Sequence, residues 1–161
     1  MSIAQEQALT DVLVEGGAHF ELLPHRHTET ARAEARALGL ELDEVAKTVI
    51  VRTPNGYVRV VVPASGRVDL GKLRALLGTE GVEGVIRLAT ESELAAVYPG
   101  FDLGAVPPLG GLAGDTVVLD LSLTRHVRLV FEAGTHEESV RLKTDNLMNL
   151  ANATIGDVCE A

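Results

Sequence analysis

Two apolar runs in the middle of the chain have the pattern of neighbouring β-strands. Residues 46–53 and 57–62 are rich in Val and Ile, whose branched side chains pack well on a pleated surface. Pro54, Asn55 and Gly56 separate the two runs, and an Asn-Gly step between β-branched runs is typical of a tight turn. The pattern therefore predicts a β-hairpin over residues 46–62.

Shorter apolar runs and alternating segments predict further strands on both sides of this hairpin. They are expected over residues 19–23, 84–88, 115–121, 126–131 and 138–143.

Helices are indicated where apolar residues recur every three or four positions, or where strong helix formers gather between capping residues and glycines. We expect them over residues 3–15, 28–38, 69–78 and 90–98, and around Leu147. Thr90 and Glu93 have the spacing of a capping box. The strands come in pairs and clusters with few helices between them, so strict β-α alternation is absent. This order favours a mixed α/β (α+β) fold, in which a curved mixed sheet carries helices on its outside.

The length of 161 residues is that of one domain, which we expect to span 1–161. A chain of this size buries enough surface to fold without disulfides, and its single cysteine, Cys159, has no internal partner. We find no apolar stretch of membrane-spanning length and no signal peptide at the N-terminus. These features predict a cytoplasmic protein without a membrane partner.

Charge and aromatic content limit the contacts that the chain could make with nucleic acid. The formal net charge is −9, and aromatic residues make up 3% of the chain. Both values argue against a protein that coats DNA or RNA, or that stacks successive bases on aromatic side chains. A local basic site for one phosphate or one acceptor end remains compatible with this balance.

Lys47 is the first candidate for chemistry. Strand alternation places it on the same face as Val49 and Val51. A lysine among valines needs a partner or a purpose, because burying an ammonium group is costly. The alternative is that this strand is a sheet edge, from which the Lys47 side chain extends to water. The pattern alone favours neither interpretation.

The second candidate is the loop over residues 103–114, which has no periodicity. It contains a G-x-x-x-P segment from Gly104 to Pro108, with Pro107 inside it and Gly110 after it. Rigid prolines and permissive glycines can present backbone groups to a small ligand, although a stiff turn without a ligand would look the same. The G-x-G-x-x-G and P-loop fingerprints are absent, so we expect no nucleotide cofactor.

A third candidate is the turn of Gly134, Thr135 and His136, between two predicted strands. Its histidine could serve a site or simply be solvated. His25 and His27 lack a third ligand at metal-binding spacing, so we expect no metal. Ser139 lacks the G-x-S-x-G context of a hydrolase nucleophile.

Taken together, these segments resemble the YbaK and prolyl-tRNA-synthetase-associated editing family. The similarity covers residues 20–150 and includes LGLELDEVAKTVIV, VVVPASGRVDLGKLRALLG, GAVPPLG and AGTHEESVRLKTDNLMNL. It implies a mixed α/β fold with a barrel-like curved sheet and no cofactor. It also implies that Lys47 is the catalytic residue. The substrate-binding residues that it implies are Thr48, Gly104, Pro107, Pro108, Gly110, Gly134, Thr135, His136 and Ser139.

The resemblance predicts a freestanding deacylase that hydrolyses the ester of a mischarged tRNA at its acceptor end. A small amino acid on tRNA-Pro is the expected substrate, and an aminoacyl-tRNA synthetase is a further expected partner. Pro107 stands where cysteine-specific members usually have a small polar residue, so cysteine is not favoured over alanine or serine. The alternatives are a non-catalytic module that binds a small ligand or an RNA end, and a regulatory partner of a synthetase.

Overall fold

The predicted hairpin forms the centre of the larger of two β-sheets. The computed structural model describes residues 2–78, 84–110 and 114–161. In it, β2 (Ala46–Thr53) and β3 (Gly56–Pro63) pair antiparallel along their whole length. β5 (Thr116–Asp120) lies parallel to β3 and β8 (Thr154–Gly156) parallel to β5, while β4 (Arg87–Leu88) lies on the outer edge of β2. The strand order is β4-β2-β3-β5-β8.

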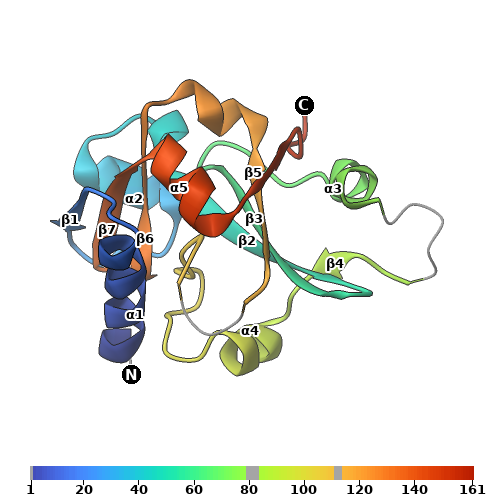
Figure 1. Cartoon of the computed structure of the whole chain (residues 1–161), viewed down its shortest axis with the longest axis horizontal. Helices are drawn as coiled ribbons and strands as arrows, with labels where there is room; N and C mark the ends of the chain where they lie inside the picture. The colour runs from blue at the N-terminus through green and yellow to red at the C-terminus, as the bar shows by residue number, and fades with distance from the viewer. Residues whose placement is uncertain (1, 79–83, 111–113) are drawn as a thin grey trace.

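The smaller sheet is antiparallel and has the order β1-β7-β6. It consists of β1 (Phe20–Pro24), β6 (Arg128–Thr135) and β7 (Glu138–Lys143). A parallel bridge between Val130 and Val45, the residue before β2, links it to the larger sheet. In Figure 1 the smaller sheet lies at the left, and the β2–β3 hairpin extends away from it toward β4.

Helices cover the faces of both sheets, and their apolar residues form the core. α1 (Ser2–Glu15) and α5 (Thr144–Ala151) pack against β6 and β7 around Phe131 and Leu147. α2 (Ala31–Leu38) packs against the opposite face of β6, at Val130. α3 (Leu70–Leu77) covers the valine face of the larger sheet, and α4 (Glu91–Val97) lies near Ile50. Within the described ranges, no helix is both long and apolar enough to cross a membrane.

The mixed α/β fold class predicted from the sequence is confirmed, but the strands do not close into a barrel. They divide into two sheets, and among the described residues the one backbone bridge between the sheets joins Val45, just before β2, to Val130 of β6. α2 begins at Ala31 and not at residue 28, because the Thr30 side chain accepts a hydrogen bond from the Ala33 N–H and caps the helix there.

Other element boundaries also differ from the expected ones. The strand expected over residues 84–88 is reduced to Arg87–Leu88. The 3-10 helices Leu42–Glu44 and Leu121–Arg125 and strand β8 had no clear signal in the sequence. Within the loop predicted over residues 103–114, residues 111–113 lie outside the described residues.

Candidate functional site

A cavity of about 500 Å³ lies where the two sheets separate. Just beyond the Val45–Val130 bridge, residues 46–48 of β2 and residues 131–132 of β6 line opposite walls. β4 pairs only with Val51 and Arg52, so in the described structure it leaves the first half of β2 uncovered along its outer edge. The remaining walls come from residues 29–34, residues 64–67, Gly104 and Val106. The volume is in the range of sites for small molecules.

Three cationic side chains line this cavity: Arg32 of α2, Lys47 of β2 and Arg67 of the loop before α3. None of them forms a hydrogen bond or ion pair through its side chain with another described residue. Burial lowers the pKa of Lys47, and the neighbouring charges of Arg67 and Arg32 lower it further, partly offset by Cys159. An anion entering the cavity would relieve this repulsion, so the three side chains are suited to bind a phosphate.

Two buried carboxyl groups, Glu34 of α2 and Glu132 of β6, also line the cavity. Burial raises the pKa of Glu34 to about 7, and the hydrogen bond from Ser139 opposes this rise. Burial raises the pKa of Glu132 to about 9, and the neighbouring Glu34, Asp102 and Glu29 raise it further. Glu132 is therefore protonated at neutral pH, whereas Glu34 titrates close to neutrality.

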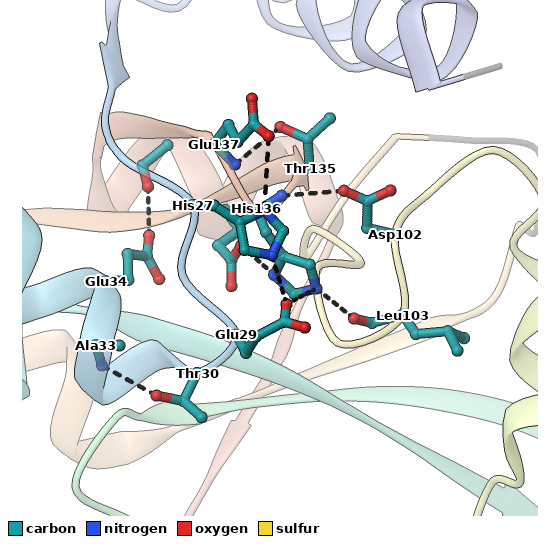
Figure 2. Close-up of polar contacts among 12 residues, drawn as sticks. His27, Glu29, Thr30, Ala33, Glu34, Asp102, Leu103, Thr135, His136 and Glu137 are labelled. Carbon is teal, nitrogen blue, oxygen red and sulfur yellow. Dashed lines mark hydrogen bonds and ion pairs between the residues drawn. The ribbon is translucent and has the colours of Figure 1, made fainter.

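His136 anchors the start of the loop that follows Asp102. Its Nε2 lies 2.6 Å from the Leu103 carbonyl oxygen, and its backbone N–H donates to Asp102 Oδ2 at 3.1 Å. A carbonyl oxygen can only accept, so Nε2 carries a proton. Nδ1 lies 3.0 Å from Glu132 Oε2 and accepts the proton of the neutral Glu132. Figure 2 shows the His136 side chain between Leu103 and Glu29.

Arg59 anchors the other end of the same loop. Its side chain is 2% exposed and donates to the carbonyl oxygens of Pro107 at 2.8 Å and Gly110 at 2.7 Å. Its Nε lies 3.0 Å from both carboxylate oxygens of Asp115, and the Tyr98 hydroxyl also donates to Asp115. The loop is thus fixed at both ends by buried side chains, which sets the position of Gly104 at the cavity.

The residues predicted for the site fall into two groups. Lys47, Thr48 and Gly104 line the cavity itself. The others lie around it and support the loop or its neighbours: Pro107, Pro108, Gly110, Gly134, Thr135, His136 and Ser139.

Gly134 illustrates this supporting role, since it has a φ of 98° and a Cβ there would lie 2.6 Å from Phe101. Its carbonyl oxygen accepts from the Asp102 N–H at 2.9 Å.

Sequence reasoning missed five charged residues of the site and its support: Arg32, Glu34, Arg59, Arg67 and Glu132. Arg59 interrupts a run of valines and therefore carries the same sequence signal as Lys47. Glu34 gave no signal, because a glutamate in an alanine-rich helix is ordinary. Among the described residues, no group of three or more His, Cys, Asp or Glu side chains is placed to hold a metal ion.

Comparisons with known proteins support the fold and identify the family. Residues 25–150 match the family model of the aminoacyl-tRNA editing domain. A proline–tRNA ligase from Thermosipho melanesiensis is 30% identical over 73 residues, which is 45% of this chain but only 13% of the ligase.

Two of the solved structures that resemble nearly the whole chain bear on its fold and family. One is that of a candidate trans-editing enzyme for prolyl tRNA synthetase. Its TM-score is 0.85 at 27% identity, with 98% of both chains covered. The other, hypothetical protein APE2540, also has a TM-score of 0.85, at 24% identity over 95% of this chain and 99% of its own, and supports the fold alone. With most of its length matched by the family model, the chain belongs to the aminoacyl-tRNA editing domain family.

Proposed function

We propose that this protein is a trans-editing deacylase that hydrolyses the ester between a small amino acid and the terminal ribose of a mischarged tRNA. The observation that carries the proposal is the cavity with three unpaired cations in a chain of the editing-domain family. The relationship to a proline–tRNA ligase and to a candidate trans-editing enzyme for prolyl tRNA synthetase favours tRNA-Pro as the carrier.

The chemistry of the cavity suits an aminoacyl end. Lys47, Arg32 and Arg67 would hold the phosphate of the terminal nucleotide, which fixes the ester next to the wall formed by Gly104. An aminoacyl ester is already activated, so positioning of a water molecule and stabilisation of the developing negative charge supply most of the catalysis. Thr48 lines the same cavity as Lys47 and is the proposed contact for the ribose or the amino acid.

The cavity would accept the acceptor end alone, because the net charge of −9 disfavours extended contact with RNA. A synthetase partner would then serve to bring the charged tRNA to the cavity. The proposed domain spans the whole chain, residues 1–161.

A panel of purified aminoacyl-tRNAs tests the proposal. Alanyl-, seryl- and cysteinyl-tRNA-Pro are incubated with the protein, with prolyl-tRNA-Pro and alanyl-tRNA-Ala as the correctly charged controls. We expect hydrolysis of at least one mischarged tRNA-Pro, well above that of prolyl-tRNA-Pro. Binding without any hydrolysis would reject the enzyme and favour a module that only captures an RNA end. Neither binding nor hydrolysis, together with a change in synthetase activity, would favour a regulatory partner.

A further inference from the structure

Three side chains form a hydrogen-bonded chain from the protein surface to the cavity. His25, which follows β1, is half-buried, and its Nε2 lies 2.9 Å from Ser139 Oγ of β7. Ser139 Oγ lies 2.5 Å from Glu34 Oε2 of α2. Ser139 and Glu34 are both 0% exposed. Figure 2 shows Glu34 and the contact of its carboxyl group. The chain therefore connects a partly exposed imidazole with a buried carboxyl group.

The hydrogen bonds of this chain fix how many protons it carries. His25 Nδ1 lies 2.7 Å from the Arg26 carbonyl oxygen, which can only accept, so Nδ1 is protonated. If the Ser139 hydroxyl donates to a Glu34 carboxylate, His25 Nε2 must donate to Ser139. If Glu34 is protonated and donates to Ser139, the hydroxyl donates to His25 Nε2. Both arrangements satisfy every contact, and they differ only in the position of one proton.

The second carboxyl oxygen of Glu34 is free. Glu34 Oε1 is buried and has no hydrogen-bond partner among the described residues, although Glu34 lines the same cavity as Lys47. A buried carboxyl oxygen without a partner is costly unless a ligand or water satisfies it. The unpartnered oxygen belongs to a side chain that borders the cavity, so a substrate or an attacking water bound there is the ligand that we expect to satisfy it.

Resting on the proposed deacylase function, we propose that Glu34 is the acid–base group of ester hydrolysis and that Ser139 and His25 exchange its proton with solvent. Water attacks the ester carbonyl carbon and gives a proton to Glu34 Oε1. The bond from this carbon to the ribose oxygen then breaks, and the ribose oxygen takes the proton from Glu34.

The balance of the reaction leaves one proton to remove. The amino acid product ionises at its carboxyl group, so each turnover releases one proton in the cavity. Glu34 accepts it, passes a proton to Ser139, and Ser139 passes its own to His25, which releases it to water. No further reactant is required.

The surroundings of Glu34 suit this role. Burial brings the pKa of Glu34 to about 7, and a general base works best when its pKa lies near the working pH. Glu132 of β6 stays protonated in this range because its pKa is about 9. Lys47 of β2, Arg32 of α2 and Glu29 also line the cavity.

The test compares three variants on the mischarged tRNA that the wild type hydrolyses: Glu34→Gln, Ser139→Ala and His25→Gln. His19→Gln is the matched control, because His19 is an exposed imidazole at the opposite end of β1. We expect Glu34→Gln to lower kcat about 10²–10⁴-fold, the usual contribution of a general acid–base group. In the wild type, kcat/KM should rise with pH through about 7, as Glu34 loses its proton.

The relay makes predictions that a merely structural role would not. The hydrogen bond from Ser139 lowers the pKa of Glu34, so Ser139→Ala should shift the rise in kcat/KM to higher pH. A ¹³C NMR titration of the Glu34 carboxyl group should show the same shift without any substrate. His25→Gln should lower kcat at unchanged KM, and added imidazole should restore part of it. His19→Gln should behave like the wild type.

The outcomes separate this proposal from the proposed function. A wild type that hydrolyses no aminoacyl-tRNA would overturn both. An active wild type with an unchanged kcat and pH profile in folded Glu34→Gln would overturn only the role of Glu34. A raised KM as the sole effect would also overturn it, and would make Glu34 a partner of the substrate ammonium group. Normal kcat in His25→Gln would overturn the relay.

Discussion

Replacing Lys47 by alanine should cost activity without costing stability. Among the described residues, Lys47 has no carboxylate partner, and it lines the cavity together with Arg32 and Arg67. Its removal therefore breaks no ion pair of the empty protein and relieves repulsion among the three cations. If Lys47 holds the substrate phosphate, the lost charge-assisted contact is worth about 1.5–3 kcal/mol. That corresponds to about a 10–100-fold loss in kcat/KM.

The stability half of this prediction has a definite pH dependence. Burial and the neighbouring arginines lower the pKa of Lys47 below its ordinary 10.5, so the folded state binds this proton less strongly than the unfolded state does. The charged lysine therefore destabilises the fold at pH values below its folded pKa, and the cost disappears as the pH rises toward 10.5. Lys47→Ala should accordingly equal or exceed the wild type in stability at pH 7, and lose any advantage near pH 10.5.

Deacylation kinetics and urea unfolding at the two pH values test both halves. Lys47→Met retains the apolar part of the side chain and separates loss of charge from loss of packing. Lys143→Ala, at an exposed position on β7, is the control for removing a lysine charge elsewhere. Activity close to that of the wild type in Lys47→Ala would remove Lys47 from the site. Inactivity together with a clear loss of stability would refute the reasoning, because it would show that Lys47 supports the fold.

Three further outcomes are expected. Arg59→Met should destabilise the fold by about 3–5 kcal/mol in urea unfolding, because it leaves the buried carboxylate of Asp115 without its cation. The control Arg141→Met, at a half-buried ion pair of 3.6 Å, should cost less than about 1 kcal/mol. Equal losses of stability in the two variants would contradict this prediction. Between pH 7 and 9 the wild type should lose stability, because the folded state holds the Glu132 proton up to about pH 9 whereas the unfolded state has already lost it. Glu132→Gln should abolish most of this loss. An unchanged loss of stability in the variant would assign it to another group. A chelator should leave deacylation unchanged; loss restored by zinc would reveal a metal site, with His25, His27 and His136 the first residues to replace.

The hairpin and Lys47 could be predicted because their signals are local. Alternating valines and an Asn-Gly turn are read within a few residues, and a lysine in such a run is conspicuous. Glu34 could not be predicted, because its burial depends on β7 placing Ser139 against α2.

The cavity depends in the same way on long-range structure. It forms only because β2 and β6 meet at Val45 and Val130 and then separate. Contacts between distant segments do not appear in any local pattern. The resemblance to the editing family pointed to Lys47 and to the loop from Gly104 to Pro108. It did not point to the other charged residues of the cavity, which are Arg32, Glu34, Arg67 and Glu132.

The separation of the two sheets gives the site a mechanical property. Lys47 and Arg67 belong to the larger sheet and its connections, whereas Glu132 belongs to the smaller one and Glu34 to the helix packed on it. A ligand that touches both groups would act as a cross-link between two sheets that share an apolar core but, among the described residues, only one backbone bridge. Local opening at that bridge would then require release of the ligand, so occupancy should slow amide exchange around Val45 and Val130 more than in the distant part of the hairpin.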